Sequence, residues 1–598
     1  MTPTLEFPAS LATHLTMLRR PAKAADRSWK RRSLWWLLAP LVLFLPLPFM
    51  PHALFFGNRD SLFYANVLAM TSDALRAGRF HTQWFADANA SMGSPVMMFY
   101  APFGYVATAL FEWPLDFLHL SLDAQYLLGI YLSQVLCGFT AFLWLKRRFS
   151  MRTAFIGSLH YVLVPYKFIY IYAHMNLAQL WALAFLPLWM LGAEELISGR
   201  RMRGAALFAL AGGATYYSHP LTVIAFGAVP VAYTLWFGRR RLSVWAWLTL
   251  ACVLMAGVSL ALAWPQHHNL SWISPEGFLA GKLAWHENLY HVDVLLCAWY
   301  GFIAGLVAVA AKRCRSIIES GLSGPALFFA TVIGIVAFLN LHLSEFIWER
   351  ISVLQYLQFP AARLHSVALI AVTFLICVWL DHYPHMLAVS RRVYKPVTIA
   401  VMIALSLAAT GARLLQFYDG RQFKAFDIAG VREARIISPP EYRTRWGCVK
   451  GSHALDLYLT HSVPSPVAAD RGLAVSLREW NPPERIAFST DVQSAQAGMT
   501  VRQCYIPAWQ AFDSGKPVPL SAAGPNGLIH LSLSPGHHNL EIRLAETADM
   551  RIVRRTSVGA LGICLVLFAC AMSLGDTNAS PGFPRDLSDE AGFRGFPI

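Results

Sequence analysis

The chain has 598 residues, of which 56% are hydrophobic and 14% charged, and its mean hydropathy is +0.44. These values exclude an ordinary soluble globular protein, in which about a quarter of the residues are charged. The formal net charge of +15 could suggest a nucleic-acid partner. However, the basic residues lie in short loops beside apolar segments rather than on one surface, so we expect a polytopic membrane protein that binds no nucleic acid.

Twelve apolar segments have the length that a bilayer core demands, roughly 17–22 residues. They predict about twelve transmembrane helices. The segments fall near residues 34–51, 124–145, 153–172, 177–196, 204–218, 221–238, 243–264, 292–311, 324–343, 364–381, 396–412 and 556–575.

Lysine and arginine cluster at every second boundary between these segments. Because such loops stay in the cytoplasm, we expect both termini inside and the loops at 52–123, 173–176, 219–220, 265–291, 344–363 and 413–553 outside. A span at 101–119 would break this alternation, so that stretch is predicted to be a surface or re-entrant helix. The basic clusters are Arg31-Arg32, Lys146-Arg147-Arg148, Arg200-Arg201-Met202-Arg203, Arg239-Arg240-Arg241, Lys312-Arg313-Cys314-Arg315 and Arg391-Arg392.

Composition divides the chain into five parts. Residues 1–33 lack the apolar core and cleavage site of a signal peptide and are predicted to be a basic cytoplasmic tail, and residues 34–412 form a transmembrane domain. Residues 413–553 are rich in Pro, Gly and Ser. Short alternating stretches at 484–490, 499–506, 527–533 and 538–544, and a strand from Trp509 that enters a tight turn at Gly515, predict a β-sandwich there. The last span follows at 556–575, and the acidic tail 576–598 is predicted to be disordered.

The first outer loop, 52–123, opens near Asp60, just after the first span. A carboxylate near the hydrocarbon costs several kcal/mol unless it is solvated or paired, so Asp60 is a candidate functional residue. The alternative is that it caps a helix beginning at Ser61. Apolar residues from Leu62 to Leu75 predict a loosely amphipathic helix in the membrane interface, which ends at Gly78. The aromatic residues that follow favour an interfacial belt, with a surface that stacks on sugar rings as the alternative; they are Phe80, Trp84, Phe85, Phe99, Tyr100, Phe103 and Tyr105.

Nine cysteines are present. The predicted topology leaves two of them, Cys448 and Cys504, in the outer domain. A disulfide between these two is slightly favoured in an oxidising compartment, and two unpaired thiols are the alternative.

Several classes of catalytic site lack their signatures in this sequence. It contains no Walker loop, no dinucleotide-binding glycine fingerprint beside a strand and no His-Glu-x-x-His zinc motif. Polar residues instead gather on the predicted outer side, where they could converge on one cavity. These residues are Asp60, Asp87, His174, Asn176, Gln179, His219, His267, His268, Glu276, Lys282, His286, Glu287, His291 and Arg363.

Over nearly its whole length the sequence resembles a family of bacterial GT-C-type membrane proteins. The family is labelled as related to 6-pyruvoyl-tetrahydropterin synthase, and its members look like glycosyltransferases. The most specific motif is Gln358-Phe359-Pro360-Ala361-Ala362-Arg363, which is similar to a Gln-Phe-Pro-x-x-Arg signature. Other matching residues are Asp60, Ala77-Gly78-Arg79-Phe80, Trp84, Gly93-Ser94-Pro95, Phe99-Tyr100-Ala101-Pro102, the segment from Tyr172 to Gln179, Pro507-Ala508-Trp509 and Asp513-Ser514-Gly515-Lys516. The chain departs from the family at Gln179, where members carry an acidic residue, and this puts a catalytic role there in doubt.

The resemblance implies a GT-C-like glycosyltransferase in the bacterial inner membrane, with its active site and C-terminal domain facing the periplasm. Its donor would be a sugar on a polyprenyl phosphate and its acceptor an envelope glycan or lipid. Inverting transfer needs a base, for which Asp60 is the candidate. It also needs a cation beside the leaving phosphate, for which Arg363 is the candidate, with snorkelling to lipid headgroups as the alternative.

The remaining candidates for substrate or phosphate binding are Gln358, His174, Asn176, Gln179, His219 and Arg59. Helix packing is the competing interpretation for His174, Asn176 and His219. No residue is assigned as a metal ligand, and a requirement for a divalent cation stays open.

Two other functions compete with the transferase. A transporter or flippase of lipid-linked glycans would place its binding groups near the membrane midplane, where His160 and Lys167 are the main polar residues. An inactive envelope scaffold whose outer domain binds glycan is the third hypothesis, and Gln179 gives it some weight.

Overall fold

The computed structural model describes residues 36–44, 59–79, 83–164, 166–167, 170–171, 175–275, 285–286, 301, 304–305, 315–382, 433, 435–437, 442–447, 460–469, 473–493 and 497–573. Helices make up most of this part of the chain. The strands within it fall between Val467 and Leu544, directly before the last helix.

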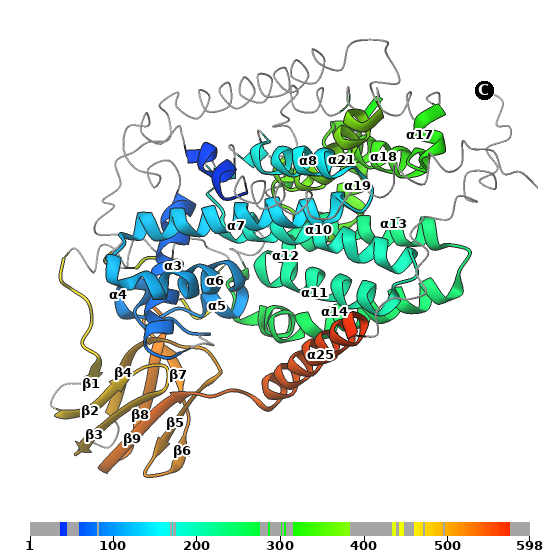
Figure 1. Cartoon of the computed structure of the whole chain (residues 1–598). Coiled ribbons are helices and arrows are strands. Elements are labelled where there is room, and N and C mark those ends of the chain that lie inside the picture. The colour runs from blue at the N-terminus through cyan, green and yellow to red at the C-terminus, as the bar shows by residue number, and fades with distance from the viewer. Residues whose placement is uncertain are drawn as a thin grey trace, which may run out of the picture.

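Long helices lie side by side in a bundle whose centre is α10 (Figure 1). Its longer helices are α7 (Leu122–Leu145), α10 (Leu177–Ile197), α11 (Arg201–Ser218), α14 (Leu242–His268), α21 (Pro360–His382) and α25 (Ala548–Ser573). Shorter helices of the bundle are α8 (Met151–Leu163), α12 (Pro220–Phe226), α13 (Ala228–Gly238) and α18 (Ser323–Leu339). Short elements are η1 (Ala39–Phe44), η5 (Asn269–Trp272), α17 (Arg315–Glu319), η6 (His342–Ser344), α19 (Glu345–Arg350) and α20 (Ser352–Gln355).

The apolar helices make this a membrane protein. Within the described residues, six helices are long and apolar enough to cross a bilayer. The number is seven if α18 and the helical segment His342–Arg350, which are bent by 92° relative to each other, count as one span. The six are Leu122–Leu145, Leu177–Ile197, Pro220–Gly238, Leu242–Trp272, Arg363–His382 and Ala548–Ser573. The predicted span at 204–218 lies in α11, which is not among the six. The predicted spans at 292–311 and 396–412 fall mostly or wholly outside the described residues, so a total of twelve is not confirmed.

Three of the predicted cytoplasmic loops meet at one end of the bundle. Glu195, which is fully buried near the end of α10, forms ion pairs with Arg147 at 2.9 Å and Arg200 at 3.4 Å, and Glu194 pairs with Arg148 at 3.2 Å. Arg241 adds a hydrogen bond from Nη1 to the carbonyl of Ile197. The predicted alternation of basic and non-basic loops therefore agrees with the way these helix ends gather.

The first loop folds over the opposite end of the bundle. Its helix α3 (Arg59–Arg76) stands across the axes of the long helices (Figure 1). The chain then reaches Gly78 at φ +75°, where the sequence predicts the end of this helix. The helix begins at Arg59 and not at Ser61, so the backbone of Asp60 lies inside its first turn and not at a cap before it.

Short helices complete this loop. They are α4 (Ala88–Ser91), α5 (Val96–Phe99), α6 (Phe103–Glu112) and η3 (Trp113–Leu118). The ten residues of α6 are too few to cross a bilayer. The stretch 101–119 is therefore not a span, as the alternation of basic loops predicts.

The prediction of an aromatic belt is wrong for several residues of this loop. Trp84, Phe85 and Tyr105 are at most 4% exposed, and Tyr100 is also buried. These side chains pack inside the hydrophobic core with α3 and the C-terminal domain, out of reach of lipid or sugar. Phe80 lies outside the described residues.

The C-terminal part forms two antiparallel sheets. One has the order β1-β4-β8-β7 and the other β2-β3-β9-β5-β6. Both contribute alternate side chains to the same buried core, although their packing as a sandwich stays a prediction. The strands are β1 (Val467–Ala469), β2 (Val475–Asn481), β3 (Arg485–Val492), β4 (Ala497–Cys504), β5 (Trp509–Asp513), β6 (Lys516–Val518), β7 (Ser521–Ala523), β8 (Leu528–Leu533) and β9 (Gly536–Leu544).

Two local predictions fall in this β-domain. The hairpin between β5 and β6 turns at Ser514 and Gly515, both at positive φ as a tight two-residue turn requires, so the predicted turn is confirmed. Cys504 ends β4 with its buried Sγ facing the carbonyl of Asn526. Cys448 lies outside the described residues, and the disulfide therefore stays a prediction.

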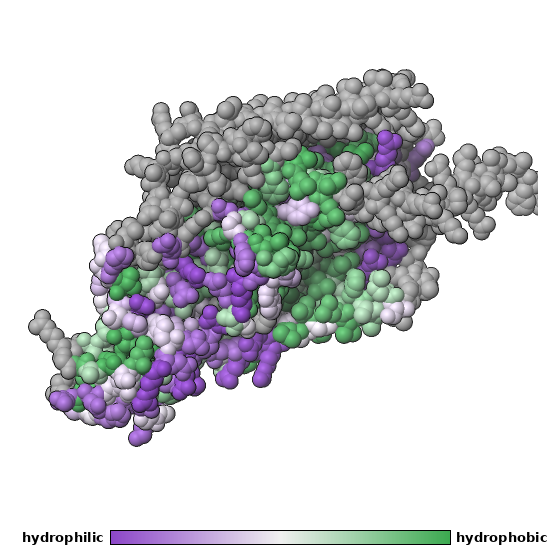
Figure 2. Space-filling model, turned by 60° about the vertical axis from the view of Figure 1, so that its left-hand side comes forward, coloured by the Kyte–Doolittle hydropathy of each residue, from purple (hydrophilic) through white to green (hydrophobic). Residues whose placement is uncertain are grey.

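The β-domain docks directly on the first loop. Trp84 donates from Nε1 to Oε1 of Gln503 over 2.7 Å, and its ring meets that of Trp509 edge to face. The backbone N–H of Cys504 donates to the carbonyl of Met92. Figure 2 shows apolar surface concentrated over the helices and polar surface toward the first loop and the β-domain.

Candidate functional site

Four segments meet at the end of the bundle that carries the first loop. They are the short stretch around Tyr170, the start of α10, the junction of α11 and α12, and the start of α21. Each brings a polar side chain inward, and the four side chains form one hydrogen-bonded cluster. Three predicted site residues, Gln179, His219 and Arg363, belong to it.

Arg363 is the centre of the cluster. Only 8% of its surface is exposed. Its Nη1 donates to Oε1 of Gln179 and to Nε2 of His219, the latter 2.8 Å away. Its Nε is buried and has no hydrogen-bond partner in the part of the chain that the structure describes. The described partners of this buried cation are neutral, and a buried charge without a counter-charge is costly, so this guanidinium is a candidate to bind an anion.

The contact with Arg363 determines the state of His219. A guanidinium has no acceptor, so Nε2 of His219 carries a lone pair, and the proton lies on Nδ1, whenever Arg363 donates to it. The backbone N–H of Thr222 caps α12 by donating to Nδ1 over 3.2 Å, and this contact favours the opposite tautomer. Nδ1 faces Oγ1 of Thr222 at 2.8 Å, and that hydroxyl can accept the proton. His219 also precedes Pro220 at the start of α12, so the helix start fixes the position of the imidazole. The imidazole is therefore neutral when it binds Arg363.

Gln179 is held by four neighbours. Asn176 caps α10 and accepts from the backbone N–H of Gln179 over 3.0 Å. The side-chain oxygen of Gln179 accepts from Tyr170 and Arg363, and its Nε2 donates to the hydroxyl of Tyr166 over 3.1 Å. The amide is thus oriented with its oxygen toward the guanidinium. Asn176 acts on the site through Gln179, as a positioning residue.

The other predicted site residues lie apart from this cluster or beyond what the structure describes. Gln358 is half-buried at φ +56°, in the turn before α21. None of the described contacts joins its side chain to Arg363. His174 and the side chains of Arg59 and Asp60 lie outside the described part of the chain, so the proposed meeting of Asp60 with Arg363 stays a prediction.

The sequence reasoning missed three members of the site. Tyr166 and Tyr170 surround the Gln179 amide with rings 4.8 Å apart, and Thr222 orients His219. The spacing of four residues between the tyrosines, just before the Asn176 cap, is a signal that could have indicated them. The spacing of three residues between His219 and Thr222 is also a local signal, because a residue at a helix cap faces the third residue after it.

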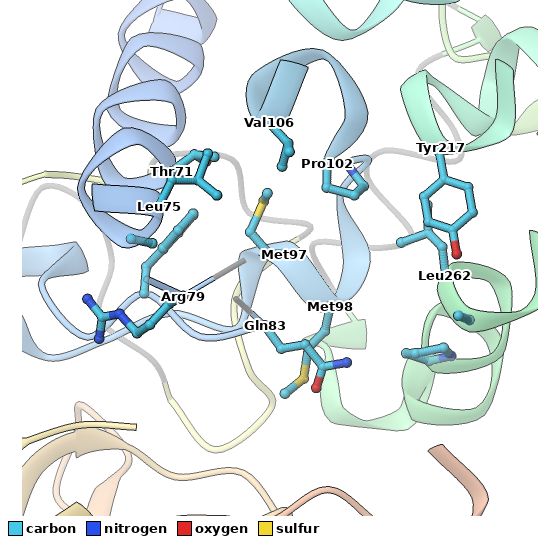
Figure 3. A pocket seen from close by; sticks show the side chains of 14 residues that line it. Thr71, Leu75, Arg79, Gln83, Met97, Met98, Pro102, Val106, Tyr217 and Leu262 are labelled. Atoms are coloured by element: carbon cyan, nitrogen blue, oxygen red, sulfur yellow. The ribbon is translucent and has the colours of Figure 1, made fainter. Parts of the chain in front are cut away.

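A separate cavity of about 110 Å³ lies between the first loop and the ends of α11 and α14. Its walls are mostly apolar, with Met97, Val106 and Leu262 among them. Figure 3 shows the guanidinium of Arg79 and the amide of Gln83 toward the same side of this space. The Arg363 cluster does not line it. Within the described residues no group of three His, Cys, Asp or Glu side chains is placed to hold a metal ion.

Comparisons with known proteins give a structural likeness and no match to a family model or a curated protein. Among solved structures the chain is similar to a mutant of the arabinofuranosyltransferase AftD from mycobacteria, with a TM-score of 0.38 and 15% sequence identity. The match covers 65% of this chain and 28% of that one, so the chain spans under a third of that protein. The likeness is too low to carry an argument, and the proposal below rests on the Arg363 cluster.

Proposed function

We propose that this protein is a GT-C-type glycosyltransferase that moves a sugar from a polyprenyl-phosphate-linked donor to a cell-envelope glycan or lipid. One observation carries the proposal: the buried guanidinium of Arg363 has neutral partners on Nη1 and an unpartnered Nε. Such a fork matches the geometry of a phosphate. Since α10 and α21, which bring the cluster together, are candidate membrane spans, a phosphate carried by a lipid is the natural ligand.

The chemistry needs one base and one fixed cation. An acceptor hydroxyl attacks the anomeric carbon, and the bond from that carbon to the phosphate oxygen breaks with its electron pair. The hydroxyl proton passes to the carboxylate of Asp60, and the configuration at the anomeric carbon inverts. Arg363 stabilises the charge that develops on the departing polyprenyl phosphate.

The neighbours of Arg363 support this role. Gln179 and His219 hold Nη1 without neutralising the charge, so the guanidinium keeps its attraction for phosphate. We infer from the positive-inside rule that the Arg363 end of the bundle faces the periplasm of a bacterial inner membrane, because the basic loops gather at the other end.

The test is transfer by the purified full-length protein in lipid vesicles. A panel of polyprenyl-phosphate-linked radiolabelled sugars is offered with envelope extract as acceptor, and the labelled product is counted. Arg363→Gln should lower transfer by about 10²–10³-fold, and Asp60→Asn should abolish it. Arg350→Gln, at an exposed arginine on α19, is the matched control and should transfer normally.

The same vesicles separate the transferase from a transporter. Full transfer by the Arg363→Gln variant would remove Arg363 from the mechanism. Movement of an intact lipid-linked glycan across the vesicle membrane, without any transfer by the wild type, would overturn the proposed function in favour of a flippase.

A further inference from the structure

The outward face of the five-stranded sheet carries a broad hollow of about 620 Å³, far from the Arg363 cluster in the chain. One row of cross-strand neighbours crosses the sheet here: Glu479 on β2, Ala487, Glu541 and Phe512 line the hollow, and Pro517 on β6 continues the row beside it. Ala487 is the smallest side chain of this row, and it lies near the middle between longer ones. The hollow is therefore built into the sheet and does not depend on a loop.

Three arginines surround this hollow, and the acidic side chains leave their charge incompletely balanced. Glu541 lies between Arg485 at 3.2 Å and Arg543 at 3.8 Å, and Glu479 lies 3.4 Å from Arg485. Arg478 instead donates from Nη1 to the neutral amide oxygen of Asn539 over 3.0 Å. Three cations and two carboxylates leave one net positive charge.

An aromatic platform adjoins the charged groups. Phe512 is half-buried on β5, next to Pro517 on β6. The guanidinium of Arg543 lies over its ring, 4.9 Å from the centroid. This cation–π contact holds a planar donor fork beside the aromatic and proline rings.

We propose that this face binds an acidic glycan, with sugar rings against Phe512 and Pro517 and a uronate carboxylate on Arg478. Planar arginine and amide groups suit paired hydroxyls and carboxylates, and the aromatic and proline rings suit the apolar faces of pyranoses. Binding of the glycan does not require that the protein be a transferase. The further step, that the bound glycan is the acceptor of the transferred sugar, rests on the proposed function.

Binding is measured with the full-length protein in detergent, by titration with an oligogalacturonate and with a neutral malto-oligosaccharide of equal length. The acidic chain should bind more tightly, and the more so at low salt. Arg478→Ser should weaken it about tenfold, and Phe512→Ala about fivefold. Arg551→Ser removes an exposed arginine from α25 and should bind like the wild type.

Several outcomes overturn the inference. They are equal affinity for the neutral chain, no binding of either chain, and oligogalacturonate binding that Arg478→Ser and Phe512→Ala leave unchanged. Displacement of the oligogalacturonate by an equal concentration of inorganic phosphate would assign the face to a simple anion. Arg363→Gln should bind the glycan normally, because Arg363 lies outside this face. Loss of glycan binding by Arg478→Ser bears on this inference, and loss of transfer by Arg363→Gln bears on the proposed function, so the two can fail separately.

Discussion

Arg363 donates from Nη1 to Nε2 of His219 over 2.8 Å, across 144 residues of sequence. Because arginine can only donate, this contact requires a neutral imidazole with its proton on Nδ1. The hydroxyl oxygen of Thr222 lies 2.8 Å from Nδ1 and can accept from it, whereas the backbone N–H of Thr222, 3.2 Å away, favours the opposite tautomer. His219 thus connects the guanidinium of Arg363, near the start of α21, to the hydroxyl of Thr222 in the first turn of α12.

The first prediction concerns Thr222→Val, which removes the acceptor from Nδ1 of His219. The backbone N–H of residue 222 then stays beside Nδ1 and favours the tautomer with its proton on Nε2, so Arg363 loses its acceptor. We expect the rate of transfer to fall about tenfold at a subsaturating concentration of donor, as it does for other residues that hydrogen-bond and orient a group in direct contact with a ligand. Thr222→Ser keeps the hydroxyl and should retain most of the activity. Equal rates for both variants would contradict the role of the hydroxyl.

The second prediction concerns Gln179→Glu. The new carboxylate would accept from Arg363 and neutralise it inside a buried site. Phosphate would then compete with an internal anion, so KM for the lipid-linked donor should rise about tenfold or more while the protein stays folded. Gln125→Glu, at the half-buried start of α7, introduces the same charge away from Arg363 and is the control. An unchanged KM in the Gln179 variant would show that donor phosphate does not meet Arg363.

Local sequence pattern was sufficient to predict the helices that carry this site. The spans expected at 124–145, 177–196 and 364–381 correspond to α7, α10 and α21 within about four residues at each end. Apolar length and basic flanking residues are properties of the helix itself. The same holds for the hairpin at Gly515, where a two-residue turn requires positive φ.

The contacts of the first loop could not be predicted in that way. Trp84 looked like a residue of a membrane-interface belt, yet it is 1% exposed because Gln503 and Trp509, more than 400 residues later, cover it. Likewise, nothing local to Gln179 shows that it faces Arg363. Sequence pattern identifies polar residues near the ends of spans, and only the packing of the spans decides which of them meet.

The third prediction compares two glycines of the first loop. Gly93 and Gly78 both have positive φ, at +81° and +75°. A Cβ at Gly93 would lie 2.5 Å from the Trp84 ring and from the side-chain oxygen of Gln503, whereas a Cβ at Gly78 meets nothing within 4 Å. Gly78→Ala should therefore cost about 1 kcal/mol of backbone strain alone. Gly93→Ala should cost about 3 kcal/mol or more, because Trp84 must also leave its place against the β-domain.

Peptide-resolved hydrogen exchange of the full-length protein tests this comparison. Gly93→Ala should increase exchange in residues 83–100 and in β4, on both sides of the contact between first loop and β-domain. Gly78→Ala should leave both regions protected. If the two variants exchange alike, Trp84 does not hold the β-domain against the loop.

The fourth prediction concerns a pH-dependent pair in the β-domain. Nδ1 of His538 lies 2.7 Å from the Asp513 carboxylate and Nε2 lies 2.8 Å from the carbonyl of Ser534. Burial opposes both charges. However, two acceptors around the imidazole raise the pKa of His538, and hydrogen bonds from His538 and the Asn539 N–H lower the pKa of Asp513. The pair is therefore most stable when both groups are charged.

The pH window follows from the direction of each shift. The contribution of His538 is complete below its unfolded pKa, near 6.5, and is lost as pH rises through its raised folded pKa. The contribution of Asp513 is present above about 4 and is lost as pH falls through its lowered folded pKa. The β-domain should thus be stabilised by about 1 kcal/mol between about pH 4 and 6.5, and less at pH 8.5.

Thermal proteolysis of the full-length protein measures this difference. Cleavage within β5 and β9 should begin at a higher temperature at about pH 5.5 than at pH 8.5. His538→Gln and Asp513→Asn should each reduce the gap between the two temperatures, because either change removes one charge of the pair. His530→Gln, on β8, changes a histidine whose contact is the hydroxyl of Thr500 and should preserve the gap. A gap that survives in both pair variants would mean that other groups of the β-domain set its pH dependence.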